Sequence, residues 1–264
     1  MLPSLQNLYR HRQLIAVLTA RDLKARYRGS ALGFFWSLAN PLLLLGVYTL
    51  VFTRFFPRPD LTPFALFLFC GILPWTFFSA AVLESTDSIF SNAGLIKKVM
   101  FPAESLPLVV VLSHLAHFVL ALPVLLAAAL VFAVAGSAQI TLDILYAPLL
   151  MLLQAIFVAG IAMMVSSASV LFRDLKDLVA NFLQLGFFLT PVLYRLETIR
   201  SLPLRMFLRL NPMTPFILGY QDIFFFSQPP HPLDLGLMFL YASLSLAAGL
   251  TVFDRLRDTL AEAI

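Results

Sequence analysis

The sequence predicts an all-α integral membrane protein with six transmembrane helices, an N-terminal interfacial helix, a cytosolic coupling helix and two short re-entrant helices at the outer face. Hydrophobic residues make up 60% of the 264 residues and charged residues 12%, whereas an average soluble domain has about 25% charged residues. The mean hydropathy is +0.90. Six windows lack Asp, Glu, Lys and Arg: residues 29–53, 61–83, 105–142, 144–172, 178–194 and 235–253.

Each charge-free window holds one predicted span, because about 20 apolar residues cross a bilayer core of about 30 Å. The six spans cover about residues 32–53, 64–83, 106–132, 146–171, 178–194 and 235–253, within one transmembrane domain of residues 1–264. Of the 18 Lys and Arg residues, 12 lie on the side that holds both termini. Because cytosolic loops are enriched in Lys and Arg, both termini are predicted to be cytosolic.

Residues 1–31 precede the first span and are rich in positive charge. Arg21, Lys24 and Arg28 share a helical face, and Arg26 lies beside them. This spacing favours a helix on the membrane surface whose basic side chains face anionic headgroups. An ordinary positive flank explains the charge equally well.

Two connecting segments are unusual in composition. Residues 84–102 begin with Ser and Asp residues suited to helix capping and end in Lys97, Lys98 and Pro102; they predict a short helix that projects into the cytosol. Residues 195–232 contain many prolines and apolar runs too short to cross the bilayer. Two short helices dipping into the outer leaflet, broken near residues 211–215, are expected there.

The string RDLK occurs at residues 21–24 and again at 173–176. Four predicted crossings separate the two copies, so both lie on the cytosolic side, each before a helix that runs outward. We interpret each copy as a charged collar where a helix begins, with Asp near the helix N-terminus. Arg173 and Asp174 are therefore predicted to lie with the N-terminal basic residues at the cytosolic entry of the transmembrane domain, near the lipid headgroups.

Several kinds of chemistry are missing from the pattern. No G-x-x-x-x-G-K-[ST] phosphate loop is present, and Cys70 is the single cysteine. His114 and His117 share a helix face, but no nearby carboxylate is expected to complete a metal site. The predicted spans carry no acidic or basic residue at mid-depth, which argues against a proton relay or a membrane enzyme. No cofactor or metal in this chain is expected, and no nucleic-acid partner.

Aromatic residues are abundant, with 26 Phe, 7 Tyr and 2 Trp. The first span carries five aromatic residues and the fifth span four: Phe34, Phe35, Trp36, Tyr48 and Phe52, then Phe182, Phe187, Phe188 and Tyr194. Interfacial belts and lipid contact account for many of them. The alternative is a pathway for sugar, because aromatic faces give apolar contact over which a polymer slides.

Four blocks of sequence resemble one family. They are RDLKARYRGSALGFFWSLANPLL (21–44), SNAGLIKKVMFPAESLPL (91–108), FRDLKDLV (172–179), and TPVLY with LNPMTPF (190–194 and 210–216). Together they are similar to ABC-2-type permeases that export polysaccharides, the class of O-antigen, teichoic acid and capsule transporters. The resemblance covers nearly the whole chain in order.

The resemblance implies a homodimer of permeases, not an enzyme, paired with two copies of a separate ATPase subunit that binds ATP and Mg. A lipid-linked polysaccharide, as in lipopolysaccharide biosynthesis, would cross the bacterial inner membrane through a channel lined by the first and fifth spans and their nine aromatic residues. ATPase coupling would fall on Asp87, Ser91, Asn92, Leu95, Lys97 and Lys98. The outer gate would hold Asn211, Pro212 and Pro215.

Three other interpretations stay open. An ABC-2 permease for a drug or a lipid would share the fold and would lack the aromatic pathway or use it for apolar cargo. A membrane enzyme of lipid-linked sugar metabolism would need paired acidic groups, for which Asp174 and Asp177 are the one candidate. A purely structural membrane scaffold is the third.

Overall fold

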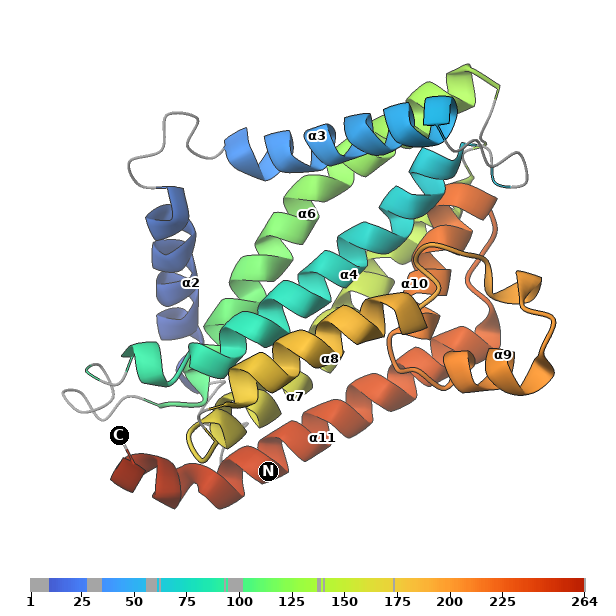
Figure 1. The fold of residues 1–264 in the computed structure, drawn as a ribbon. Helices are drawn as coiled ribbons and strands as arrows, with labels where there is room; N and C mark the ends of the chain where they lie inside the picture. Colours follow the sequence, from blue (N-terminus) through green and yellow to red (C-terminus); the bar gives the residue numbers. More distant parts are fainter. Residues whose placement is uncertain are drawn as a thin grey trace.

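The computed structural model describes residues 10–27, 35–55, 61, 63–92, 94, 102–136, 139, 141–172 and 174–263 (Figure 1). Across these residues all regular structure is helical, and no strand occurs in this part of the chain. The predicted all-α class is confirmed. The order is α2 (Arg12–Tyr27), α3 (Trp36–Leu50), η2 (Val51–Phe55), α4 (Phe64–Asp87), η4 (Phe90–Asn92), α6 (Ser105–Val134), η5 (Leu142–Tyr146), α7 (Ala147–Ser169), α8 (Leu175–Leu189), η6 (Leu196–Thr198), α9 (Leu202–Arg209), α10 (Thr214–Gln221), η7 (Asp222–Phe226) and α11 (Pro232–Ala263).

Four helical segments are long and apolar enough to cross a bilayer. They are Phe64–Asp87, Ser105–Val134, Leu142–Ser169 and Pro232–Leu256, and they match the second, third, fourth and sixth predicted spans. The second helix extends one turn past the predicted end at residue 83, so Glu84 and Asp87 belong to α4 rather than to a projecting helix.

The first and fifth predicted spans are helical but short. Helix α3 has 15 residues and the π-helical η2 adds 5. Helix α8 has 15 residues, about 22 Å at 1.5 Å per residue. The prediction that the fifth helix reaches Tyr194 is wrong, because Thr190 precedes Pro191 and takes an extended conformation (φ −107°, ψ 139°).

The long helices run side by side, and the connections gather at two ends (Figure 1). One end brings together the end of α4, the start of α6, the turn between α7 and α8, and the C-terminal part of α11. There Ile89, Met163, Leu250 and Phe253 form a small apolar cluster. Helix α2 lies at this end and packs Ile15 and Leu18 against α6. The opposite end holds η5, η6, α9 and η7, so successive helices alternate in direction as predicted.

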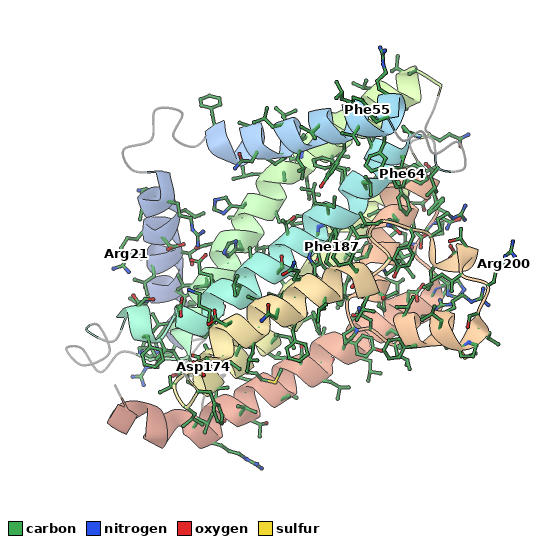
Figure 2. All side chains as sticks on the ribbon, viewed as in Figure 1. Arg21, Phe55, Phe64, Asp174, Phe187 and Arg200 are labelled. Carbon is green, nitrogen blue, oxygen red and sulfur yellow. The ribbon has the colours of Figure 1, made fainter. Side chains whose placement is uncertain are left out.

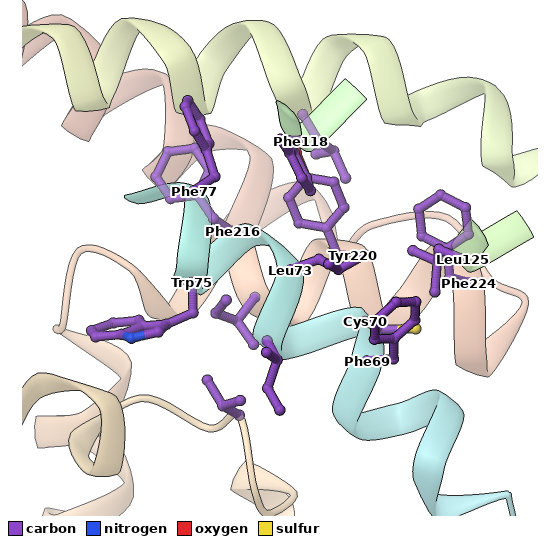
Figure 3. Close-up of a cluster of buried hydrophobic side chains, with 14 of the residues drawn as sticks. Phe69, Cys70, Leu73, Trp75, Phe77, Phe118, Leu125, Phe216, Tyr220 and Phe224 are labelled. Atoms are coloured by element: carbon purple, nitrogen blue, oxygen red, sulfur yellow. The ribbon is translucent and has the colours of Figure 1, made fainter. Parts of the chain in front are cut away.

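Helix α10 lies inside the bundle rather than on it (Figure 3). Phe216, Ile217 and Tyr220 are fully buried. The Phe216 ring lies 5.4 Å from Phe157 of α7, and the Tyr220 ring lies 5.5 Å from Phe118 of α6. Two short helices, α9 and α10, lie on either side of the Asn211 turn where the sequence predicts re-entrant helices. Helix α10 is surrounded by protein, which is what a short helix at membrane depth requires.

Two buried glutamine side chains donate hydrogen bonds to the backbone carbonyls of proline residues. Gln154 Nε2 of α7 donates to the Pro74 carbonyl of α4 at 2.8 Å, and Gln221 Nε2 of α10 donates to the Pro191 carbonyl at 2.9 Å. Both glutamines are buried. These bonds link α7 to α4 and α10 to the turn that follows α8.

Helices α7 and α11 approach so closely that only glycine fits at their crossing. A Cβ atom at Gly160 would lie 2.2 Å from the Ser245 carbonyl carbon, and a Cβ atom at Gly249 would lie 2.4 Å from the Gly160 oxygen. Ser245 Oγ adds a hydrogen bond to the Phe157 carbonyl at 3.1 Å. The small-residue contact holds these two spans together as in other membrane helix pairs.

Candidate functional site

An aromatic cavity lies between α4 and α8. It measures about 360 Å³ and is lined by Trp75, Ser79, Leu183, Gln184, Phe187 and Phe188. The rings of Trp75 and Phe187 lie 5.8 Å apart, and those of Phe187 and Phe188 lie 5.4 Å apart. Figure 2 shows Phe187 at the middle of the helix layer, on α8 beside α4. Ring faces next to an amide and a hydroxyl suit the apolar faces and hydroxyl groups of a sugar.

Gly186 of α8 allows the Trp75 side chain to pack against the helix backbone. A Cβ atom at Gly186 would lie 3.2 Å from the Trp75 ring, so the indole lies directly on the backbone of α8. Trp75 itself is buried, while Gln184 and Phe188 are exposed. The sequence prediction missed Trp75 because it assigned channel residues only to the first and fifth spans.

The other predicted channel aromatics separate into distinct places. Phe182 on α8 is 73% exposed, and Phe35 before α3 is 69% exposed. Tyr48 and Phe52 instead pack inward, and the Phe52 ring lies 4.6 Å from Phe64 of α4. Tyr194 donates its hydroxyl to the Phe188 carbonyl at 3.1 Å. Phe34 and the Trp36 side chain lie outside the described residues.

A polar network joins α2, α4 and α6 at the end where α2 lies. Glu84 of α4 accepts a hydrogen bond from His114 Nε2 of α6 at 2.8 Å and forms an ion pair with Arg26 of α2. Arg26 Nε also pairs with Asp22 at 3.1 Å. Arg26, predicted to face headgroups, thus holds the surface helix to two spans.

The expectation that no carboxylate lies near His114 is wrong. Glu84 precedes it by 30 positions, and the antiparallel pairing of α4 and α6 brings the two together. His117 instead donates Nδ1–H to the Ser113 carbonyl of its own helix at 2.7 Å. Among the described residues no group of three or more His, Cys, Asp or Glu could hold a metal ion.

The second RDLK string contributes a link between α8 and α4, because Lys176 forms an ion pair with Asp87. Asp177 lies in the first turn of α8, and Asp174 is its N-cap residue, although its side chain makes no capping hydrogen bond. In the first string, Arg21 and Lys24 are exposed on α2 (Figure 2). Arg28 and Arg173 lie outside the described residues.

The predicted coupling segment is described only in part. Ser91 Oγ donates to the Asp87 carbonyl at 2.7 Å, and Asn92 Nδ2 donates to the Ser88 carbonyl at 2.9 Å. These two hydrogen bonds join the single turn η4 to the C-terminal end of α4. Leu95, Lys97 and Lys98 lie outside the described residues.

At the opposite end, Asn211 ties the turn between α9 and α10 to α8. Its Nδ2 donates to Thr190 Oγ1 at 2.9 Å, and its Oδ1 accepts from the Met213 backbone N–H at 3.0 Å. Pro215 is buried at the start of α10, whereas Pro212 is exposed in the turn. The predicted gate residues therefore join three helices at one point.

Charged groups surround the same outer turn. Arg209 of α9 pairs with the buried Asp234 of α11 at 3.0 Å, and the Arg195 guanidinium lies 4.8 Å from the centre of the Phe226 ring. Burial raises the pKa of the Asp222 carboxyl from 3.8 to about 6, although a hydrogen bond from Gln228 acts in the opposite direction. The Asp222 carboxyl at this end therefore takes up a proton at a higher pH than an ordinary aspartate.

The fold and these contacts define a helical protein with several apolar helices long enough to cross a membrane, an aromatic cavity among its helices and charged contacts at both ends. The profile of ABC-2 type transporters matches residues 13–225. The chain belongs to this family.

Two relatives that match this chain over nearly their whole length are named as O-antigen export permeases, and a third relative matches a shorter part. The O-antigen export system permease protein RfbA of Myxococcus xanthus is 38% identical over 265 residues, which covers 100% of both chains. A protein with the same name from Klebsiella pneumoniae is 31% identical over 251 residues, 95% of each chain. The polysialic acid transport protein KpsM of Escherichia coli is 31% identical over 85 residues, 31% of this chain and 32% of its own.

Proposed function

We propose that this chain is the transmembrane permease subunit of an ATP-binding-cassette exporter for a lipid-linked polysaccharide. The observation that carries the proposal is the likeness, over the full length of both chains, to a permease named for O-antigen export. The aromatic cavity of α4 and α8 supports a sugar cargo, because indole and phenyl faces bind sugar rings without fixing one register.

In this proposal the chain crosses the membrane six times, with α3 and η2 as the first crossing and α8 as the fifth. Helix α8 is short for a crossing, and in this proposal the α9–α10 region that follows it completes the fifth crossing to the outer side. Two copies form the channel. The face of α8 that bears Leu178, Phe182, Leu185 and Phe188 is exposed, which leaves it available to a second copy or to the polymer.

Energy comes from a separate ATPase subunit that binds ATP and Mg. A partner shifts a conformational equilibrium only through contacts that differ between states. Helix α2 and the turn after α4 are the proposed docking elements. Glu84 links α2 to α6, and Asp87 links this region to α8 through Lys176, so a shift at the docking end reaches the helix that bears Phe187.

The proposed location is the bacterial inner membrane with both termini in the cytosol. The end that gathers α2 and the C-terminal part of α11 is then cytosolic, and the Asn211 turn is the outer gate. The polymer moves from the first end to the second past Trp75.

Complementation tests the proposal. A strain that lacks this gene but retains the ATPase subunit and the polymer synthesis enzymes is expected to accumulate polymer inside, and the wild-type chain restores surface polymer. Trp75→Ala is expected to reduce surface polymer at least severalfold at equal protein level, whereas Leu152→Ala, at an exposed position of α7, leaves it unchanged. Surface polymer that does not depend on the gene contradicts the proposal.

A further inference from the structure

A second and larger cavity lies on the other side of α4, among α3, α4 and α6. It measures about 640 Å³, within the range of small-ligand sites. Its apolar walls come from Leu44 and Val47 of α3, Leu73 and Phe77 of α4, and Phe118 of α6. In Figure 1, α3 and α4 diverge toward α2, and α6 lies between them. This cavity is separate from the aromatic cavity beside α8.

Most polar groups of the cavity lie at one end, and the Thr76 hydroxyl of α4 bonds to the Leu73 carbonyl of its own helix. Arg26, Asn40 and His114 line it at the end nearest α2, and His117 lies one turn further along α6. Val47, Leu73 and Ala121 line the other end. From His114 to Ala121, α6 advances by about 10 Å, part of the roughly 15 Å that one leaflet contributes to the bilayer core. The cavity is thus polar at one end and mostly apolar beyond it, over a depth somewhat less than that of one leaflet.

Arg26 is held in place over the polar end. Its Nε donates to Asp22 at 3.1 Å and its Nη2 pairs with Glu84. A guanidinium has five N–H groups, so N–H groups remain that have no partner among the described residues. Glu84 also accepts from His114. Asp22 and Glu84 therefore orient the guanidinium beside the cavity without using all of its donors, and Glu84 also fixes the His114 ring at the same end.

We propose that this cavity binds one anionic membrane phospholipid, with its phosphate at Arg26 and one hydrocarbon chain between α3, α4 and α6. Basic pockets between transmembrane helices at the cytosolic side bind anionic headgroups. The cavity is too small for a polysaccharide and is apolar along its depth, which suits an acyl chain. The bound lipid fills the space behind α3 and sets the position of this helix relative to α4. This inference does not depend on the cargo of the transporter.

Native mass spectrometry of the full-length chain in a mild detergent tests the proposal. The probes are phosphatidylglycerol and phosphatidylcholine with identical acyl chains, and inorganic phosphate. We expect one phosphatidylglycerol to remain bound, with at least tenfold weaker binding of phosphatidylcholine and no retention of phosphate. Equal retention of the two lipids would show non-specific surface lipid and overturn the proposal, as would retention of phosphate alone.

Two variants locate the site. Arg26→Gln is expected to weaken phosphatidylglycerol binding at least tenfold, whereas Arg200→Gln removes the same charge from an exposed position before α9, away from the cavity, and leaves binding unchanged. Ala80→Phe fills the cavity from α4 and is expected to abolish retention, whereas Leu152→Phe, on an exposed face of α7, does not. Thermal unfolding of each variant with excess lipid gives a second readout: parent and controls are stabilised, and the two site variants are not. Equal lipid stabilisation of all variants refutes the site.

Discussion

The crossing of α7 and α11 gives the sharpest prediction for stability. Replacing Gly160 with Ala places a Cβ atom 2.2 Å from the Ser245 carbonyl carbon and 2.4 Å from the Leu246 nitrogen. Ordinary contacts begin at 3.4 Å, so the backbones must separate by about 1 Å. No side-chain rotation relieves the clash, because every nearby atom in that contact belongs to the backbone of α11.

Separation by about 1 Å loses up to half of the dispersion energy at each contact across the interface. It also lengthens the hydrogen bond from Ser245 Oγ to the Phe157 carbonyl, which is 3.1 Å long. Overpacking usually costs 1–3 kcal/mol; with backbone on both sides we expect about 3 kcal/mol. In a chain of this size, that lowers the melting temperature by roughly 6–12 °C.

Thermal unfolding of the purified full-length chain, followed by intrinsic fluorescence in detergent, measures the effect. The matched control is Gly236→Ala, on α11 itself, where a Cβ atom meets nothing within 4 Å. The control is expected to melt at or slightly above the wild-type temperature, because Ala favours a helix over Gly by about 0.5–1 kcal/mol. If Gly160→Ala and the control melt alike, the close backbone approach is not present in the protein.

Three other changes address charge and cargo. Asp222→Asn is expected to stabilise the protein at pH 7 by about 1 kcal/mol after allowance for solvent screening. Because burial raises the pKa of Asp222 to about 6, protonation of this carboxyl adds stability to the parent as pH falls from 7 to 4. Melts of the variant across that range are expected to lack this gain. Lys176 and Asp87 should show a small favourable coupling in a double-mutant cycle of melting experiments, as exposed ion pairs do, and zero coupling contradicts the contact. Trp75→Phe should retain more export than Trp75→Ala in a surface-polymer assay, because a ring remains in the cavity; equal loss would assign the indole a purely structural role.

The sequence predicts the helical class and four of the spans because long charge-free windows suffice to identify them. It also predicts the break between α9 and α10, since Asn211 and Pro215 both disfavour a continuous helix. It does not predict where α8 ends, because Leu178 to Tyr194 are all compatible with a span by composition. The end is set locally by Thr190, which the following Pro191 keeps out of the helical conformation.

The contacts of the candidate site join residues that are distant in the sequence, so the local sequence pattern does not predict them. Trp75 and Phe187 lie far apart in sequence and meet because α4 and α8 are neighbours. Glu84 reaches His114 because α4 and α6 form an antiparallel pair. An apolar window that ends in Glu84, followed by an apolar window that contains a histidine, is the one signal in the sequence that points to this contact.

Reconstituted transport tests the proposed function most directly. The full-length chain and its ATPase subunit are placed in proteoliposomes with a lipid-linked polysaccharide on the ATPase side, and polymer that reaches the other side is detected with a lectin. We predict transfer that requires ATP and Mg, stops with vanadate and falls severalfold with Trp75→Ala but not with Leu152→Ala. ATP hydrolysis without any polymer transfer, together with ATP-dependent movement of a small lipid or drug, would contradict the account.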